Sequence, residues 1–506
     1  MLSMFNPLFR KRFVVWIILL HFVTWAIAKD IYVAQTASGS GDGGSVANAS
    51  PVTWLNASSS WGSGSGQVNA GDTVHLCGAI NSTVLVQGSG TAGHLLTLLF
   101  EPNAKLSQPA GTLLQCNGQS YLVIDGGANG VLENTDNGSA LANHVAVSGI
   151  YAPMCSNLEV KNLTVQDLYV HTSPADSAVD FGAVGGVYLN GFGGNVSVHD
   201  CKFQDVCWVL NMSSGITGAS GLSIYNNTFT NYDHAIAGLG GALANPANIN
   251  IYNNQFGSTS NWDTTGNVYH HDGIHIFFPP GTTLSGMNIY GNLFNGNWGV
   301  NNTAHLFIEG DYSRVNPSSV SNVAIWNNVF SQSGGNLLNN GFLAGTGSNW
   351  RIQNNTFLGA GVRNSGAIFL TVTGLALANN VFTGVTTYVT AASGTTFSAG
   401  GTSYNLYAEA TPGGNAPWSL SGTGYNSLGA WQLATGQEAQ SLVAGHAYLN
   451  TDGTLQATSP AVGAGVNLFA YFTTDKTGVS RSTPWDMGAY KYLGPKAPKN
   501  LRGTSR

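Results

Sequence analysis

The chain has 506 residues, of which only 8% are charged, against about a quarter in an ordinary soluble domain. Disordered chains lack aromatic residues, whereas this one has 12 Trp, 19 Tyr and 22 Phe, so the low charge does not indicate disorder. The net charge is −6 and most Lys and Arg lie near the two ends, which argues against a nucleic-acid partner because such a partner needs a basic face. The composition predicts a large soluble β-protein rich in turns.

Residues 1–28 have the pattern of a secretory signal peptide. The basic stretch RKR (10–12) precedes the apolar run FVVWIILLHFVTWAIA, which ends in Ala-Ile-Ala before Lys29. A signal anchor that stays uncut is the alternative. No later apolar run approaches the ~20 residues of a membrane helix. We therefore expect a secreted protein, extracellular, cell-surface or periplasmic, without membrane contact after signal cleavage.

Five cysteines are too few, and odd in number, for a disulfide framework, so buried unpaired thiols are expected. They are Cys77, Cys116, Cys155, Cys201 and Cys207.

One pattern recurs through the middle of the chain, as in NVSVHDCKF (195–203), NINIYNNQF (248–256) and NVAIWNNVF (322–330). Each copy alternates apolar and polar residues, which is the period of a strand. A pair such as Asn-Asn or Gly-Asn then precedes a closing aromatic residue. Asn and Gly tolerate left-handed backbone angles, so the pair predicts a sharp bend between two strands. The closing aromatics are Phe203, Phe229, Phe256, Phe294, Phe330, Phe357 and Phe382.

A second apolar strand lies between consecutive copies, as in DGIHIFF and AHLFIEG. A unit of about 25 residues cannot bury its own apolar face, so the copies must stack into one continuous core. The repeat therefore predicts an all-β, parallel β-helix solenoid. Two longer intervals, ending at Phe294 and Phe330, indicate coils with insertions, and insertions gather on one face that is often the binding face.

These coils and both ends of the chain resemble the secreted right-handed parallel β-helix superfamily, which has the pectin-lyase-like fold. DIYVAQTASGSGDGGS (30–45) and GDTVHLCG (71–78) resemble the N-terminal strand and cap of bacterial members. SPAVGAGVNL (459–468) and WDMGAYKY (485–492) resemble their closing segment. The superfamily includes polysaccharide lyases, glycoside hydrolases, esterases, epimerases and adhesins, so the resemblance implies the fold more strongly than the chemistry.

We expect one right-handed β-helix domain over residues 29–492. Its N-terminal cap covers about 29–80, regular coils about 81–385, and irregular final coils with a closing segment about 386–492. The basic tail, 493–506, is predicted to be disordered.

Acidic and imidazole side chains concentrate on the coils with the longest loops. No Lys or Arg lies between Lys202 and Arg314, whereas NVYHHDGIHIF (267–277) alone contains three histidines and Asp272. Outward positions on neighbouring coils should form ladders, because adjacent strands lie ~4.8 Å apart. Inward Ile274 and Ile276 would leave His275 facing outward.

By the same alternation, inward Leu306 and Ile308 would leave His305, Phe307 and Glu309 facing outward. We predict that Asp272 forms an acid/base pair with Asp311 or Glu309. Two carboxylates would lie ~4.8 Å apart if stacked directly and roughly 8 Å apart if displaced by two residues. These separations are close to the retaining (~5–5.5 Å) and inverting (~6.5–9.5 Å) geometries of glycosidases.

The predicted site residues fall into two groups. The catalytic group is Asp272, Asp311, Glu309, His275 and His305. The substrate-binding group is Asp233, His234, Tyr269, His270, His271, Phe277, Tyr312 and Arg314.

No metal and no cofactor are expected. His271 and His275 have ligand-type spacing, but on a strand residues i and i+4 lie ~13 Å apart. Calcium held by Asp233, Asp272 and Asp311 is the alternative, and it would need oxygen-rich ligation.

Three functions remain open. Paired carboxylates on a rigid solenoid favour glycoside hydrolysis of a polysaccharide. A lyase that acts on a uronate polymer is the second hypothesis, although only Arg314 could supply the Lys or Arg base common in family lyases. A non-catalytic glycan-binding or surface-interaction β-helix is the third. A monomer is expected because capped solenoids need no partner.

Overall fold

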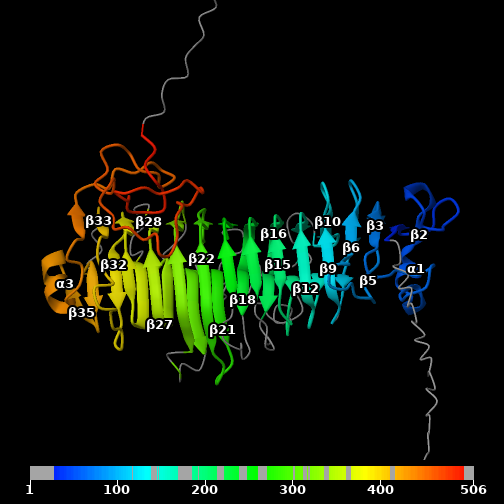
Figure 1. The fold of residues 1–506 in the computed structure, drawn as a ribbon, viewed down its shortest axis with the longest axis horizontal. Coiled ribbons are helices and arrows are strands. Elements are labelled where there is room, and N and C mark those ends of the chain that lie inside the picture. Colours follow the sequence, from blue (N-terminus) through cyan, green and yellow to red (C-terminus); the bar gives the residue numbers. More distant parts are fainter. Residues whose placement is uncertain are drawn as a thin grey trace, which may run out of the picture.

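The computed structural model describes residues 28–116, 118–137, 145, 147–168, 185–191, 193–212, 221–238, 248–259, 270–299, 302–311, 316, 319–334, 341–359, 366–410 and 416–494. Nearly all of the predicted signal peptide and tail lie outside these ranges. Strands stack side by side along one long axis, with the N-terminal cap at one end and helix α3 at the other (Figure 1). The predicted all-β, right-handed parallel β-helix is confirmed.

Three ladders of parallel strands run along this axis, and each coil contributes a strand to each ladder in turn. The first ladder contains β1 (Asp30–Ala34), β3 (Thr73–Cys77), β6 (Leu96–Phe100), β9 (Ser120–Asp125), β12 (Ser156–Lys161), β15 (Val196–His199), β17 (Leu222–Tyr225), β19 (Ile249–Tyr252), β22 (Leu284–Tyr290), β25 (Val320–Trp326), the C-terminal part of β27 (Leu343–Gln353) and β30 (Ala376–Ala378).

The second ladder begins after each Asn bend. It contains β4 (Ala79–Ile80), β7 (Lys105–Gln108), β10 (Val131–Asn134), β13 (Thr164–Gln166), the first parts of β16 (Lys202–Met212) and β18 (Thr228–Gly238), β20 (Gln255–Phe256), β23 (Leu293–Phe294), β26 (Val329–Ser331), β28 (Thr356–Leu358), β31 (Val381–Thr383), β33 (Leu406–Ala408) and β36 (Leu442–Ala444).

The third ladder is formed by the apolar strands predicted between the repeats. It contains β5 (Val84–Leu85), β8 (Gly111–Gln115), β11 (Val147–Tyr151), β14 (Gly185–Tyr188), the ends of β16 and β18, β21 (His271–Phe278), β24 (Asn302–Asp311), the start of β27, β29 (Gly366–Thr373), β32 (Thr387–Ala391) and β34 (Trp418–Leu420).

The predicted Asn bends are confirmed. The first residue of the bend has a positive φ, for example 54° at Asn253, 54° at Asn327 and 65° at Gly291. The second residue is a buried Asn whose Nδ2 donates to Oδ1 of the next Asn along the axis, at 3.0–3.1 Å. We call this column the asparagine ladder: Asn227, Asn254, Asn292, Asn328, Asn355, Asn380 and Asn405.

The closing aromatics form a second column inside the solenoid. Their rings stack from Phe203 to Tyr407 with centroid separations of 4.5–5.3 Å. Ile and Val of the ladders surround this stack in one continuous core. The five cysteines are buried, as expected, and none of them forms a disulfide bond.

Both ends of the solenoid are covered. At the N-terminal end lie β2 (Ser50–Pro51), the one-turn helix α1 (Val52–Leu55) and the short 3₁₀ turns η1 (Val46–Asn48) and η2 (Ser58–Ser60). At the other end, β35 (Thr423–Tyr425) pairs antiparallel with β34, and α3 (Leu428–Thr435) buries Trp431. The closing segment then returns over the coils (Figure 1), where Arg481 donates to Asn327 Oδ1 at 2.9 Å.

Helix α3 was not predicted, although its ends carry a sequence signal. Ser427 accepts a hydrogen bond from the backbone N–H of Ala430, and Gly436 ends the helix with φ 68°. Within the described ranges, no helix is long and apolar enough to cross a membrane.

Candidate functional site

The candidate site lies on the third ladder, where β18, β21 and β24 are adjacent. His234 of β18 is opposite Asp272 of β21, which in turn is opposite Ala304 of β24. The pairing of β21 with β24 shifts twice, once between His271 and Asp272 and once between Ile276 and Phe277. Bulges of this kind redirect side chains and are common beside active sites. The second shift leaves Glu309 as the extra residue.

Gly273 explains why Asp272 and His275 share a face although they are three residues apart. A Cβ at Gly273 would lie 3.0 Å from Trp298 and 3.1 Å from Phe294, so this position faces the core. Ile274 faces the core as well. Two consecutive inward positions turn the chain and leave the residues on either side pointing outward together.

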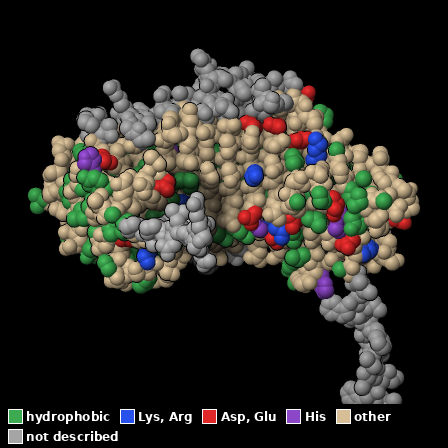
Figure 2. All heavy atoms as spheres, turned by 90° about the horizontal axis from the view of Figure 1, so that it is seen from above, with side chains coloured by type: hydrophobic (Ala, Val, Ile, Leu, Met, Phe, Trp, Pro, Cys, Tyr) green, Lys and Arg blue, Asp and Glu red, His purple; other side chains and the backbone are tan. Residues whose placement is uncertain are grey.

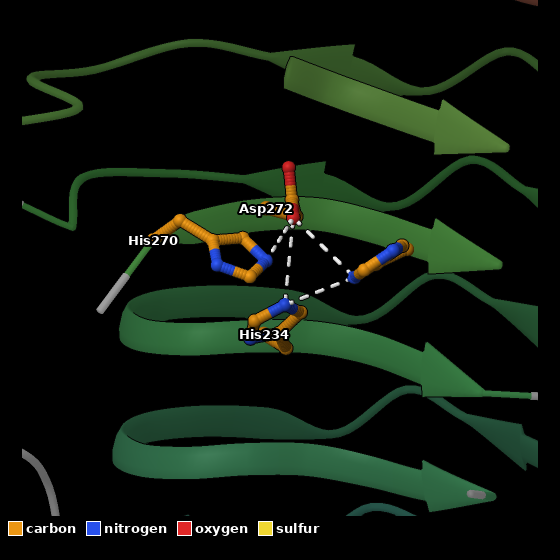
Figure 3. Close-up of side chains that lie close together, drawn as sticks. His234, His270 and Asp272 are labelled. Carbon is orange, nitrogen blue, oxygen red and sulfur yellow. Dashed lines mark hydrogen bonds and ion pairs between the residues drawn. The ribbon is translucent and has the colours of Figure 1, made fainter. Parts of the chain in front are cut away.

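Four side chains converge at this turn, and we call them the Asp272 cluster: His234, His270, Asp272 and His275 (Figure 3). Oδ2 of Asp272 lies 3.4 Å from His234 Nε2, 3.3 Å from His270 Nε2 and 3.5 Å from His275 Nδ1. His234 Nε2 and His275 Nδ1 are 3.2 Å apart. The sequence analysis set histidine ligands aside because residues i and i+4 lie far apart on a strand. The cluster instead combines His234 of one coil with His270, Asp272 and His275 of the next.

Two more carboxylates flank the cluster. Asp233 Oδ2 lies 3.3 Å from Nδ1 of His234, and Glu309 Oε2 lies 3.3 Å from Nε2 of His275. Each of these histidines therefore directs one ring nitrogen into the cluster and the other toward a carboxylate.

These contacts shift the pKa values of the buried groups. Burial lowers the pKa of His234, but the carboxylates of Asp233 and Asp272 outweigh it and raise the pKa to about 10. Burial raises the pKa of Asp233, but His234 and His271 together hold it well below its usual value. Without a bound cation, Asp233 and Asp272 therefore favour the protonated form of His234.

Access to the cluster is unequal. The Asp272 side chain is completely buried, whereas those of His270 and Glu309 are 49% and 16% exposed. A polymer on the outer face could touch His270 and Glu309 but not Asp272. Aromatic rings border the cluster, since His275 stacks on Phe307 at 4.7 Å and contacts Phe277 at 4.7 Å.

His305 is not where the sequence placed it. Its ring is completely buried, with centroids 3.9 Å from Trp298 and 5.7 Å from Phe294. The reason is the turn at Gly273, because His305 occupies the matching position of β24 and faces inward with it. The expectation that His305 faces outward is therefore wrong, and it packs on Trp298, a core residue.

Asp311 does not lie near Asp272. It is opposite Phe278, at the far end of β21, whereas Asp272 is at the beginning of that strand. Six residues of strand separate the two positions, or about 20 Å. The structure therefore supports no Asp272–Asp311 pair and does not assemble the calcium site imagined from Asp233, Asp272 and Asp311. Glu309 remains the carboxylate near Asp272, with His275 between them.

The other predicted residues divide into two sets. Asp233, His234, His270, His271 and Phe277 lie in or around the cluster, and buried His271 donates from Nδ1 to Asp233 Oδ1 at 3.1 Å. Tyr269, Tyr312 and Arg314 lie outside the described residues.

Sequence reasoning missed Trp208, whose Nε1 donates to Asp233 Oδ2 at 3.1 Å and whose ring meets Phe277. Trp208 lies one coil before His234, and no recognisable sequence motif surrounds it.

A separate hollow lies away from the Asp272 cluster. A groove of about 900 Å³ runs along the ends of the second-ladder strands beneath residues 446–456, and Glu409 and His446 pair across it at 2.7 Å. No member of the Asp272 cluster lines it. Figure 2 shows how sparse charged side chains are on one face of the molecule.

Comparisons with known proteins find distant structural similarity. Pectate lyase Pel9A matches with a TM-score of 0.42 and 14% identity, over 92% of this chain and 97% of that one. A mannuronic acid specific polysaccharide family 6 lyase from human gut microbiota matches with a TM-score of 0.41 and 14% identity, over 76% and 75%. The GH136 lacto-N-biosidase from Eubacterium ramulus matches with a TM-score of 0.41 and 11% identity, over 82% and 67%.

No family model and no curated protein matches the chain. Structural similarity at this level says nothing about activity.

Proposed function

We propose that the chain is a secreted, carbohydrate-active enzyme that cleaves a polysaccharide on the outer face of β18, β21 and β24. The proposal is carried by one observation: imidazoles and carboxylates gather behind His270 and Glu309 on a chain with only 8% charged residues. Buried ionisable groups cost free energy, so such a cluster on a scaffold that avoids charge favours a chemical role.

Glycoside hydrolysis is the reaction we assign first. Glu309 is the partly exposed carboxylate, and it can protonate the glycosidic oxygen as the bond from that oxygen to the anomeric carbon breaks. Water adds to the anomeric carbon and loses its proton to the solvent, from which Glu309 is protonated again. His275 Nε2, 3.3 Å from Glu309, orients this carboxylate and tunes its proton transfer. Proton transfer by a positioned group typically accelerates a reaction about 10²–10⁴-fold.

A polysaccharide lyase is the second candidate, and the three converging imidazoles favour it. β-Elimination removes the proton next to a uronate carboxylate, breaks the bond to the leaving sugar oxygen and forms a carbon–carbon double bond. It needs a base and positive charge to neutralise the uronate. Exposed His270 can act as the base. The positive charge of protonated His234, or a bound cation, can neutralise the uronate carboxylate.

The experiment uses the full secreted protein on a panel of neutral and uronate polysaccharides. Reducing ends without ultraviolet absorbance indicate hydrolysis, and absorbance of an unsaturated product indicates elimination. We expect Glu309→Gln to lower the rate about 10²–10⁴-fold. His199→Gln is the matched control, because His199 also lies between carboxylates, at 2.7 and 3.1 Å, but outside the site.

Binding without cleavage by the wild-type protein would contradict the proposal and favour the non-catalytic hypothesis. An equal loss of cleavage rate in Glu309→Gln and His199→Gln would also contradict the proposal. Export is proposed from residues 1–28, and a monomer from the covered ends of the solenoid.

A further inference from the structure

We infer that His234, His270, Asp272 and His275 bind a transition-metal ion of the Zn²⁺ type. This inference goes beyond the proposed function and does not depend on it. Nitrogen-rich ligation with one carboxylate suits zinc and its neighbours, whereas calcium and magnesium prefer oxygen.

Four of the six distances between the ligand atoms fit the edges of a tetrahedral site. Zinc binds His nitrogen at about 2.0–2.1 Å, so ligand atoms at the corners of a tetrahedron around it lie about 3.3–3.4 Å apart. Asp272 Oδ2 lies 3.4, 3.3 and 3.5 Å from the nitrogens of His234, His270 and His275. The fourth short edge, between His234 Nε2 and His275 Nδ1, is 3.2 Å. The remaining two edges are below 4.8 Å.

These distances do not fit charge-assisted hydrogen bonds, which are about 2.7–2.9 Å long. The same molecule provides the comparison. His75, His199 and His446 each approach one carboxylate oxygen to 2.6–2.7 Å. Three imidazole nitrogens at 3.3–3.5 Å from one oxygen therefore leave room for an ion between them, rather than for shared protons alone.

Asp272 Oδ2 supplies an independent observation. This atom is completely buried and accepts no hydrogen bond. The other oxygen, Oδ1, accepts from the backbone N–H of Ala304 at 2.9 Å, which fixes the carboxylate so that Oδ2 faces the three histidines. A buried, unpaired carboxylate oxygen is costly, and a cation at the centre of the cluster would remove that cost.

The surrounding residues complete the pattern of a metal centre. Metal-bound histidines usually hold their second ring nitrogen on a carboxylate or carbonyl, which fixes the tautomer. His275 does so with Glu309, through a hydrogen bond of 3.3 Å, and Nδ1 of His234 faces Asp233 Oδ2 at 3.3 Å without a hydrogen bond. His270 precedes β21 and its side chain is 49% exposed, so it is the ligand that water or a substrate can replace.

The test measures zinc in the full-length protein after chelation and dialysis against Zn²⁺, by elemental analysis and titration calorimetry. We expect one equivalent in the wild-type protein and at least 100-fold weaker binding in Asp272→Asn. Asp233→Asn and Glu309→Gln should weaken binding about 10–100-fold. His270→Ala should retain the ion with reduced affinity, because three ligands remain. Co²⁺ in place of Zn²⁺ should give the intense visible bands of four-coordinate cobalt.

His199→Gln is again the control and should bind zinc as the wild-type protein does. Circular dichroism and thermal melting of each variant separate loss of the ion from loss of the fold. Zinc uptake no greater than in Asp272→Asn, or a six-coordinate cobalt spectrum, would overturn the inference. Zinc bound by a protein that cleaves no polysaccharide would sustain the inference and count against the proposed function alone. Cleavage by a wild-type protein that takes up no zinc would overturn the inference and leave the proposed function standing.

Discussion

Gly273 decides which side chains reach the outer face around the site. It adds a second inward position before Ile274, and the bend turns Asp272 and His275 outward while His305 of the next coil turns inward. His305 then lies among Trp298 and other aromatic rings, with neither ring nitrogen hydrogen-bonded. Because its ring faces the core and packs on Trp298, Phe294 and Phe342, His305 contributes to packing rather than to the site.

We expect His305→Phe to leave the free energy of unfolding within about 1.5 kcal/mol of the wild-type value and to leave activity unchanged. His305→Ala should lower that free energy by roughly 2–5 kcal/mol, because it opens a cavity in the core. Denaturant unfolding measures both. Loss of activity in a folded His305→Phe protein would instead return His305 to the catalytic group.

The same residue predicts a pH effect. Burial holds the pKa of His305 well below its ordinary value of 6.5. The unfolded chain therefore takes up a proton below pH 6.5 that the folded protein does not, and stability falls as the pH falls through that value. The difference in unfolding free energy between His305→Phe and wild type should grow in favour of the variant from pH 7 to pH 5, about the range over which an unfolded histidine titrates. A difference independent of pH would contradict this reading.

At the scale of the element, the two residues of each bend have separate roles. Asn253 is exposed and supplies the positive φ of 54°. Asn254 is buried, donates to Ile224 O and Asn292 Oδ1, and accepts from the backbone and side chain of Asn227.

We expect Asn254→Ala to lower the free energy of unfolding by roughly 3 kcal/mol or more, because several buried polar groups lose their partners. Asn253→Ala should lower it by roughly 1–2 kcal/mol through backbone strain alone. Asn253→Gly is the matched control and should be nearly neutral, since Gly291 already occupies the same place in the next coil. Thermal and denaturant unfolding rank the stabilities of the three variants. Equal losses of unfolding free energy in Asn254→Ala and Asn253→Ala would contradict the separate roles of the two residues.

The coils could be predicted because their signals are local. Alternation, the Asn pair and the closing Phe each lie within nine residues, as in NINIYNNQF (248–256). The site could be predicted only in outline, because its geometry depends on pairing between coils. Nothing in AHLFIEGD marks Glu309 as the bulged residue, and nothing in HHDGIHIF marks Gly273 as a bend. A one-residue error of this kind misplaced His305, whereas Asp311 lies opposite Phe278, six residues of strand from Asp272.

At the scale of the whole molecule, an open solenoid end would expose unpaired strand edges and core residues. Helix α3 covers the C-terminal end, where Trp431 is fully buried between Phe397 and Tyr425, with ring centroids 6.0 and 5.8 Å away. On the same helix, the Leu433 side chain is 90% exposed.

We expect Trp431→Ala to lower the free energy of unfolding by roughly 3–5 kcal/mol and to promote self-association. Leu433→Ala should change stability by no more than about 0.5 kcal/mol. Denaturant unfolding and light scattering distinguish them. A Trp431→Ala protein as stable and monodisperse as Leu433→Ala would show that α3 is not a structural cap.

The asparagine ladder also has a direction. It begins at the backbone N–H of Cys201, which donates to Asn227 Oδ1. Each later side-chain amide donates one hydrogen bond to the next Asn toward the C-terminal end and another to a backbone carbonyl of the preceding coil. Asn405 gives its own to Glu438, a carboxylate that only accepts. Interior amides are interchangeable relays, so a coil could be duplicated or lost between Asn227 and Asn405 with the chain of dipoles intact. Beyond Glu438 no further amide can be added, and the length of the solenoid is set there.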